Sequence, residues 1–404
     1  MNTGVLERLR ALLGSDSVSR DPDGVPRAVP DSTDALAATL RLADEAGWRV
    51  RLEGHGSWVP PDAGADLALT TRGLDRIVTV QPADLVATVE AGVSMDALQR
   101  RLAAEGMWLA LDPPGRPERT IGSVVATATA GALRAGFGPV RDHILGCTAV
   151  TGDGRVIRPG GTVVKNVAGY DLTKLQVGGF GAFGVLTTLH LRLRALPAAD
   201  VTHLARGSRD DLTRAARELH AAGVETAALE LLSPAVSAEA DWILAARCIG
   251  SPEGAAGDAG RLRSVTALEW TELDAERSHA FWHLVTHAGS GAPVSLRLGV
   301  LAAGLDEMLD LVEQQLEEGL VWAGALQGGM RWAGNAAPDR LRTLRNLAAE
   351  REVPLTLERA PWATRNAVGH FGAYREGVGP LVTQLREVFD PTGRLVVAMD
   401  GDDS

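Results

Sequence analysis

The sequence contains few cysteines and no long hydrophobic run. Its 404 residues include two cysteines, Cys147 and Cys248, which are too few for the thiolates of an iron–sulfur cluster and too far apart for a CxxC redox pair. Any iron–sulfur chemistry must therefore come from another chain. The chain has no hydrophobic run of membrane-spanning length, and its start has no apolar signal-peptide run. We expect a cytoplasmic protein without a direct membrane span, membrane-associated at most through its partners.

Runs of Lys and Arg are also absent, and the formal net charge is −11. A nucleic-acid-binding protein needs a clustered basic face to neutralise phosphates, so we expect no nucleic-acid partner. Hydrophobic residues make up 45% of the chain, which is enough for a large core divided over two or three domains.

The first half alternates short helical and strand-like segments. Asp31, Ser32 and Thr33 are N-cap candidates for a helix that ends at Gly47. Further elements are expected as strands at 49–53, 77–80 and 85–91, a helix at 94–104, and a hairpin with the turn 152–154. The second half reads twice as strand, helix, strand, which predicts an α+β layer with antiparallel sheet and a mainly structural role. A last helix is predicted at 378–389.

The glycines of the segment 178–184 have the spacing GxGxxG, which alone is weak evidence of a dinucleotide-binding Rossmann turn. That turn needs a strand before it and a helix after it. Here residues 171–176 resemble a helical turn, and residues 189–194 alternate as a half-exposed strand. We therefore reject Rossmann binding and predict a loop whose backbone amides approach a ligand.

A second glycine segment, EGHGSW at 53–58, follows a predicted strand. Gly54 and Gly56 free the backbone, so the loop could form an anion nest for a pyrophosphate. An ordinary β-turn explains the same residues equally well. A third segment, 111–131, is rich in small residues that would let a flat ring lie against the backbone, and a tightly packed buried helix is its alternative.

Taken in order, five segments resemble the vanillyl-alcohol-oxidase-like, PCMH-type FAD-binding family, and more closely the family of FAD-binding E subunits of bacterial glycolate oxidase. The most specific is VKNVAGYDLTKLQVGGFGAFGVLT, and the resemblance covers roughly residues 30–197. It implies an α+β fold with a two-lobed FAD domain and a ferredoxin-like α+β cap. The parts would be an N-terminal extension (1–29), the FAD-binding domain (30–197), the cap or substrate domain (198–377), and a C-terminal helix and tail (378–404).

The resemblance also implies which residues bind FAD. They are Gly54, His55, Gly56, Ser57 and Trp58 at the pyrophosphate, Pro113, Pro114, Thr120, Gly122, Ser123, Ala126, Gly131 and Gly138 at the flavin, and Gly184 and Val185 toward the adenine. Some relatives attach FAD covalently through a histidine in the first loop. Ser57 occupies that position here, so the resemblance implies non-covalent FAD. His55 stands where the family usually has glycine, and Trp58 is bulkier than usual.

Catalytic members of the family carry a histidine-rich segment in the cap, and this chain has no such cluster. His279, His283 and His287 would share one face of a helix, but no carboxylate pattern supports a metal, so we predict none and prefer a solvated or packed helix. Arg297 is a candidate clamp for a substrate carboxylate, because a guanidinium matches a carboxylate bidentately. A strand arginine more often faces solvent.

Three functions follow from the resemblance. The first is the FAD-binding subunit of a glycolate oxidase or dehydrogenase complex, which oxidises a small 2-hydroxy acid beside a catalytic flavin subunit and an iron–sulfur subunit. The second is a stand-alone FAD oxidoreductase for another alcohol or 2-hydroxy acid. The third is a scaffold without catalytic activity. No catalytic base is evident in the sequence.

Overall fold

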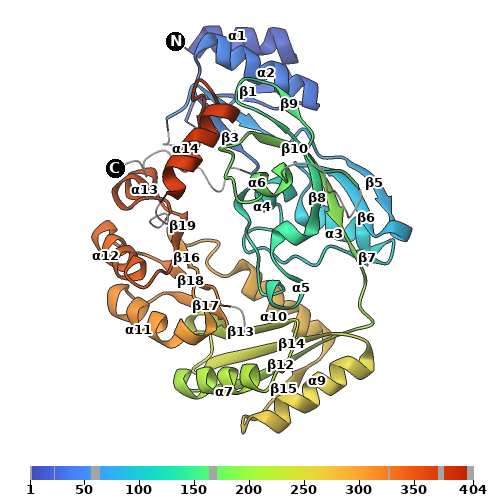
Figure 1. Ribbon diagram of the computed structural model, residues 1–404, viewed down its shortest axis with the longest axis vertical. Helices are drawn as coiled ribbons and strands as arrows, with labels where there is room; N and C mark the ends of the chain where they lie inside the picture. The colour runs from blue at the N-terminus through green and yellow to red at the C-terminus, as the bar shows by residue number, and fades with distance from the viewer. Residues whose placement is uncertain are drawn as a thin grey trace.

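The computed structural model describes residues 2–21, 23–55, 64–162, 171–325, 328–371 and 377–397, and it has an α+β architecture (Figure 1). Two five-stranded sheets, each with its own hydrophobic core, form the two lobes of the first half. An eight-stranded sheet forms the second half, which we call the cap. The two lobes lie at the top and right of Figure 1 and the cap lies below them.

The first lobe contains the sheet β1-β2-β4-β3-β20. Its strands are β1 (Val18–Arg20), β2 (Pro26–Ala28), β3 (Val50–Glu53), β4 (Leu67–Thr70) and β20 (Leu395–Val396). The helices α1 (Asn2–Leu13) and α2 (Thr33–Ala46) pack on it. As predicted, Ser32 caps α2 by accepting a hydrogen bond from the Ala35 amide, and Gly47 ends the helix in the left-handed conformation.

Both ends of the chain contribute to this lobe. β20 pairs in parallel with β3, and Phe389 at the end of α14 (Val378–Phe389) is buried in the same core as Leu9 of α1. Figure 1 accordingly draws the red α14 close to the blue first lobe. The last part of the chain thus returns to the first sheet.

The second lobe contains the antiparallel sheet β5-β6-β10-β8-β9. Its strands are β5 (Ile77–Gln81), β6 (Val86–Glu90), β10 (Val185–Arg192), β8 (Ile144–Val150) and β9 (Val156–Ile157), covered by α3 (Met95–Ala103) and α4 (Ile121–Thr127). β8 and β9 form the predicted hairpin around Gly152–Gly154. Short elements complete the lobe: α5 (Arg134–Phe137), α6 (Leu172–Gln176), and the pair β7 (Met107–Trp108) and β11 (Arg194–Ala195).

The cap consists of two ferredoxin-like βαββαβ units joined edge to edge, and the strand–helix–strand pattern that the sequence shows twice corresponds to part of each unit. The first unit has the strand order β15-β12-β14-β13 and the second the order β17-β18-β16-β19, and β13 pairs with β17. The strands are β12 (Ala199–Gly207), β13 (Ala228–Leu232), β14 (Trp242–Gly250), β15 (Thr271–Leu273), β16 (Val294–Leu298), β17 (Leu320–Gly324), β18 (Met330–Gly334) and β19 (Leu355–Arg359). The sequence pattern did not reveal β15, β18 and β19.

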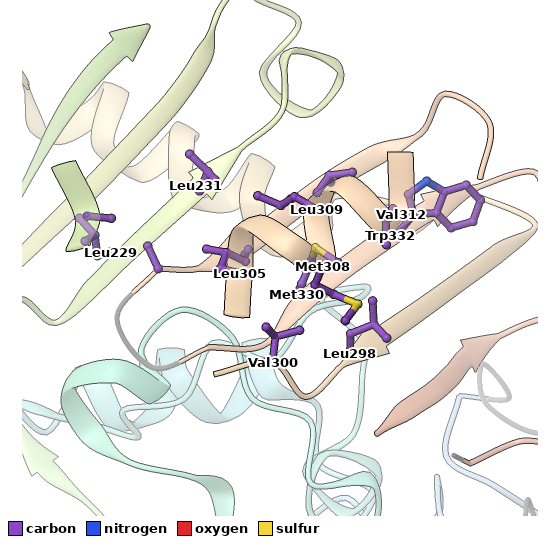
Figure 2. Close-up of a cluster of buried hydrophobic side chains, with 14 of the residues drawn as sticks. Leu229, Leu231, Leu298, Val300, Leu305, Met308, Leu309, Val312, Met330 and Trp332 are labelled. Carbon is purple, nitrogen blue, oxygen red and sulfur yellow. The ribbon is translucent and has the colours of Figure 1, made fainter. Parts of the chain in front are cut away.

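One face of the cap sheet carries four helices, α7 (Arg209–Ala221), α9 (Pro252–Val265), α11 (Leu305–Gln315) and α12 (Pro338–Ala349). Figure 2 shows part of the core beneath them, where Leu229, Leu298 and Trp332 point toward α11 from three different strands. Because side chains alternate along a strand, the residues between these face away from the four helices, toward the opposite side of the sheet. Smaller cap helices are α8 (Pro234–Ser237), α10 (Ala275–His287) and α13 (Trp362–Val368).

The opposite faces of the two units differ in polarity. In the first unit this face is mostly apolar and packs against Trp282 and Val285 of α10, with Glu230 of β13 as a polar exception. In the second unit it presents polar residues, since Arg297, Arg331 and Glu358 alternate with the core residues of β16, β18 and β19. The polar face is therefore turned toward the two lobes.

Candidate functional site

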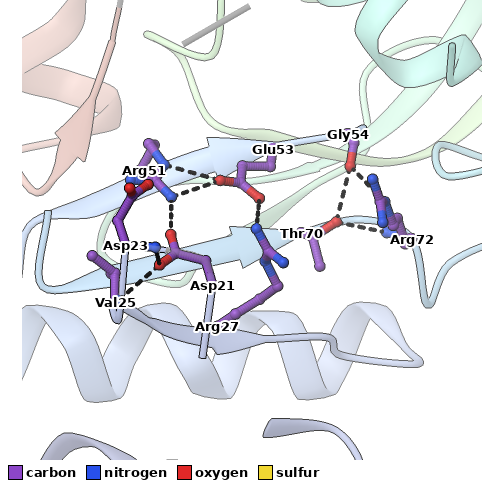
Figure 3. A network of polar contacts seen from close by, with 9 residues as sticks. All are labelled: Asp21, Asp23, Val25, Arg27, Arg51, Glu53, Gly54, Thr70 and Arg72. Carbon is purple, nitrogen blue, oxygen red and sulfur yellow. Dashed lines mark hydrogen bonds and ion pairs between the residues drawn. The ribbon is translucent and has the colours of Figure 1, made fainter. Parts of the chain in front are cut away.

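A buried ionic network holds the strand that leads into the first glycine loop (Figure 3). The Arg51 side chain is 1% exposed, and its Nη2 lies 2.5 Å from Asp21 Oδ2 and 2.8 Å from Glu53 Oε1. Glu53 also pairs with Arg27 at 3.2 Å. Burial opposes ionisation of Asp21, but hydrogen bonds from Arg51 and the Val25 amide outweigh it, so the pKa of Asp21 lies below its usual value.

The network fixes the position of Gly54, the residue after β3. Its carbonyl oxygen accepts hydrogen bonds from Thr70 Oγ1 (3.1 Å) and Arg72 Nε (3.3 Å). A Cβ atom at Gly54 would lie 2.6 Å from Thr120 Oγ1, which is closer than real side chains approach. Glycine is therefore required for the first loop to meet the third segment.

The third segment forms the short helix α4, so the small residues do pack as a buried helix. Thr120 caps it by accepting a hydrogen bond from the Ser123 amide at 3.2 Å. Gly122 lies against the backbone of Ala91, where a Cβ would meet the carbonyl oxygen at 2.7 Å. The same helix also lines a cleft, and that a flat ring lies against its backbone stays a prediction.

This cleft, of about 100 Å³, lies between the two lobes. It brings together six of the residues predicted to bind FAD: Gly54, Gly122, Ser123, Ala126, Gly184 and Val185. Gly184 has a φ of 118° and leads directly into β10, as expected for a glycine loop that enters a strand. Phe180 and Gly181 of the same loop also line the cleft. The glycine spacing in 178–184 had predicted that this loop approaches a ligand, but it had not indicated that Phe180 lines the cleft.

Other predicted residues lie around two larger cavities. His55 and Pro114 line a cavity of about 720 Å³, where burial and the charge of Arg72 lower the pKa of His55. Gly131 lines a cavity of about 480 Å³. Pro113 and Thr120 are buried, and Gly138 packs against Asp142. The remaining predicted residues, Gly56, Ser57 and Trp58, lie outside the described residues.

Three arginines and one glutamate meet where the cap faces the lobes. Arg331 Nε lies 3.2 Å from Glu358 Oε2, and Arg297 Nε lies 3.8 Å from Glu358 Oε1. Arg119 approaches from the third segment, where its guanidinium donates to the carbonyl oxygen of Pro114 (2.6 Å) and to Thr127 Oγ1 (2.7 Å). Arg331 Nη2 also donates to the Ala130 carbonyl at 2.9 Å and so links the cap to this segment.

The cluster carries more positive than negative charge. Burial, together with the charges of Arg331 and Arg297, lowers the pKa of Arg119 to about 10 despite the opposing charge of Glu358. Glu358 is ionised, because the three guanidinium groups outweigh its burial and hold its pKa below the usual value. Its Oε1 atom is buried without a hydrogen-bond partner among the described residues. Three cations for one carboxylate leave the cluster suited to an anion.

The cavity of about 480 Å³ lies beside this cluster. Arg297, Arg331, Trp322 and Glu230 line it from the cap, and residues 130–132 line it from the third segment. Sequence reasoning had named only Arg297. Polar residues at alternate positions of otherwise apolar strands, as in MRWAG, LTLER and ALELL, are the signal that could have found Arg331, Glu358 and Glu230.

The three spaced histidines lie on α10 as expected. The rings of His283 and His287 stack with centroids 4.0 Å apart, and partial burial together with the charges of His287 and His279 lowers the pKa of His283. Among the described residues, no group of three or more His, Cys, Asp or Glu side chains is placed to hold a metal ion. The role of these histidines is not assigned.

Comparison with known families indicates the cofactor of this chain. Residues 27–160 match the family described as FAD binding domain. The cleft between the lobes is lined by small residues from three segments, and Arg72 and Arg119 line the separate cavity of about 720 Å³. The chain is therefore a flavoprotein with FAD as its cofactor.

Part of the chain is similar to curated subunits of glycolate oxidase and to a 2-hydroxy acid dehydrogenase. The chain is 40% identical over 127 residues to glycolate oxidase subunit GlcE of Escherichia coli, covering 31% of this chain and 36% of that protein. It is 30% identical over 217 residues to glycolate oxidase subunit GlcD of Bacillus subtilis, covering 52% and 45%. A D-2-hydroxyglutarate dehydrogenase of Xanthomonas citri is 28% identical over 199 residues, covering 47% and 41%. The chain thus spans less than half the length of these relatives.

Solved structures share the fold along nearly the whole chain. p-Cresol methylhydroxylase matches with a TM-score of 0.79 at 12% identity, covering 98% of this chain and 96% of that one. A 4-ethylphenol oxidase from Gulosibacter chungangensis matches with a TM-score of 0.78 at 14% identity and the same coverage. The PCMH-type fold predicted from the sequence is confirmed. In the part of the chain that the structure describes, every helix is too short or too polar to traverse a bilayer.

Proposed function

We propose that this protein is an FAD-dependent oxidoreductase acting on a small 2-hydroxy acid, and that it works as a subunit of a glycolate oxidase type of complex. The observation that carries the proposal is the excess of arginine over carboxylate where the cap meets the third segment. The matched relatives support it, because they are glycolate oxidase subunits and a 2-hydroxy acid dehydrogenase. The partners would be a catalytic flavin subunit and an iron–sulfur subunit, since two buried cysteines cannot hold a cluster.

The cleft between the lobes would hold FAD without a covalent bond. Gly54, Gly122 and Gly184 keep its walls close, and His55, the residue after Gly54, lines the cavity of about 720 Å³ together with Arg72. When bound, the flavin supplies hydride acceptance, which no side chain can supply. The chain's own part is to position the substrate beside residues 130–132 and to keep its charge neutralised.

Arg297 and Arg331 would bind the substrate carboxylate. They stand directly opposite each other on β16 and β18, line one cavity, and share the single carboxylate Glu358. A substrate carboxylate would supply the second negative charge and accept bidentate hydrogen bonds. Its arrival would therefore relieve the repulsion that lowers the pKa of Arg297 beyond the effect of burial.

Anaerobic reduction tests the proposal. The purified chain, alone and co-expressed with its neighbouring genes, is mixed with glycolate, D-lactate and other short 2-hydroxy acids while the flavin absorbance is followed. Bleaching only with partners present would support the subunit, and bleaching of the isolated chain would identify a stand-alone oxidoreductase. A yellow protein that no 2-hydroxy acid bleaches in either form contradicts the proposed reaction, and a preparation that stays colourless after addition of FAD favours a scaffold.

A further inference from the structure

Glu230 lies at the centre of the cap sheet but does not belong to its hydrophobic core. Its strand β13 pairs with β14 on one side and with β17 on the other, where Glu230 stands opposite Gly324. Leu229 and Leu231 point into the core beneath the helices. By alternation Glu230 points the other way, toward the third segment.

The Glu230 side chain is buried, and it lines the cavity of about 480 Å³ together with Arg297 and Arg331. Gly324 leaves room for it, since a Cβ there would lie 3.4 Å from Glu230 Oε1. A strand residue that only filled the sheet would be apolar, as its neighbours Ala228 and Leu232 are. A buried carboxyl group beside an open cavity is instead placed to meet a ligand.

We propose that Glu230 is the catalytic proton acceptor for the hydroxyl group of the substrate. The inference rests on the proposed function, because it needs a 2-hydroxy acid bound with its carboxylate on Arg297 and Arg331. Glu230 lines the same cavity as the two arginines, so a hydroxyl group one carbon away from the bound carboxylate would lie in the cavity that Glu230 borders. The sequence had supplied no histidine base for this step.

Oxidation of a 2-hydroxy acid to a 2-oxo acid breaks two bonds of the substrate. The C2–H bond breaks and its hydrogen leaves as a hydride to FAD, the oxidant. The O–H bond breaks as its proton passes to the Glu230 carboxylate, and the carbon–oxygen bond at C2 becomes double. The product is a 2-oxo acid, still bound by its carboxylate.

The surroundings of Glu230 suit a group that exchanges a proton near neutral pH. Burial and the charge of Asp112 raise the pKa of Glu230 to about 8, against the opposing effect of Arg331. Asp112 is itself raised to a pKa of about 6, mainly by burial. The other charged groups that line the cavity are Arg134, Arg141, Lys174 and Arg297. Since a general base works best with a pKa near the working pH, Glu230 fits the role better than Glu358, whose pKa is lowered.

The test compares Glu230→Gln with the wild-type complex. Gln preserves the size of the side chain but cannot take up the proton. FAD content is measured first, and then the affinity for oxamate, which has a carboxylate but no hydroxyl hydrogen to lose. At pH 6.5 wild-type Glu230 is neutral like Gln, so both proteins should bind oxamate within about threefold. Flavin reduction by the 2-hydroxy acid is measured at pH 8, where about half of wild-type Glu230 is ionised, and it should be at least about 100-fold slower in the variant, as expected for a lost general base.

The pH dependence gives an independent readout. Above pH 8 ionised Glu230 repels the anion, so oxamate binding by the wild type should weaken while binding by Glu230→Gln changes less. Glu239→Gln is the matched control, since Glu239 pairs with Arg206 on the cap surface far from the cavity. If flavin reduction in Glu230→Gln is as fast as in the wild type, the proton-acceptor role of Glu230 is wrong, but the proposed function is not affected. A wild-type complex that binds oxamate but is reduced by no 2-hydroxy acid would overturn the proposed function, and the proton-acceptor role with it.

Discussion

Gly54 and Thr120 come from two different motifs of the sequence, and they touch in the folded protein. The space between them is so small that a Cβ on Gly54 would lie 2.6 Å from Thr120 Oγ1. Thr120 Oγ1 is meanwhile engaged as the N-cap of α4. Gly54 lines the cleft between the lobes together with Gly122 and Ser123 of α4, so the contact couples the geometry of the first loop to that of the third segment.

The first prediction concerns this contact. Gly54→Ala should lower the affinity for FAD by at least about tenfold, because about 1.4 kcal/mol of misfit is enough for that change. Equilibrium titration of the apoprotein with FAD measures it. Gly257→Ala is the control, since Gly257 is an exposed residue of α9 with nothing within 4 Å of an added Cβ. It should leave FAD affinity unchanged and stabilise the fold by about 1 kcal/mol.

The second prediction concerns the buried network behind Gly54. Asp21→Asn removes one of the two carboxylates that face Arg51 and should destabilise the protein by about 2 kcal/mol, because a charge-assisted hydrogen bond is lost and Arg51 would then share Glu53 with Arg27. Urea unfolding measures the loss. Asp96→Asn removes half of an exposed pair with Arg100 and should change the midpoint little. Equal losses of stability in the two variants would show that the buried Asp21–Arg51 pair stabilises the protein no more than the exposed pair does.

The third prediction concerns Arg331. Arg331→Met should raise the KM for a 2-hydroxy acid by about 10- to 100-fold, since a hydrogen bond to a charged group contributes about 1.5–3 kcal/mol. FAD should remain bound, because Arg331 lies on the cap and not in the cleft. Steady-state kinetics with the full complex measures KM, and Arg206→Met on the cap surface is the control. An unchanged KM in Arg331→Met would exclude it from carboxylate binding.

The fourth prediction concerns His203 on β12, which is buried with both ring nitrogens unpartnered among the described residues. Burial and the charge of Arg263 lower its pKa in the folded state. The unfolded chain therefore takes up a proton first as the pH falls through about 6.5, and stability declines from there down to the folded pKa. His203→Leu should remove this part of the acid sensitivity and raise stability by about 1 kcal/mol.

Urea midpoints at pH 7.5 and pH 5.5 check this expectation. The gap between the wild type and His203→Leu should widen at the lower pH. His220→Gln, at an exposed position of α7, should follow the wild type at both pH values. If the gap stays constant, the titration of His203 does not contribute to acid unfolding.

The sequence by itself determined which segments line the cleft between the lobes, because its signals are local. Small residues in 118–132 and glycines in 178–184 are needed where backbones come close, and a strand after Gly184 excludes a Rossmann turn. The repeated strand–helix–strand pattern likewise indicated that the cap has two similar parts. Hydrophobic residues recur with a different spacing in a strand and in a helix, so the sequence itself marks where one element gives way to the other.

Only the tertiary structure decided which distant residues meet. Arg119, Arg297, Arg331 and Glu358 are scattered over 240 positions and gather because β16, β18 and β19 pair side by side and face the third segment. Strand alternation sets the direction of each side chain, but the strand order sets its neighbours, and that order depends on packing between units. The same holds for β20, whose two residues join the first sheet through a pairing that no local pattern encodes.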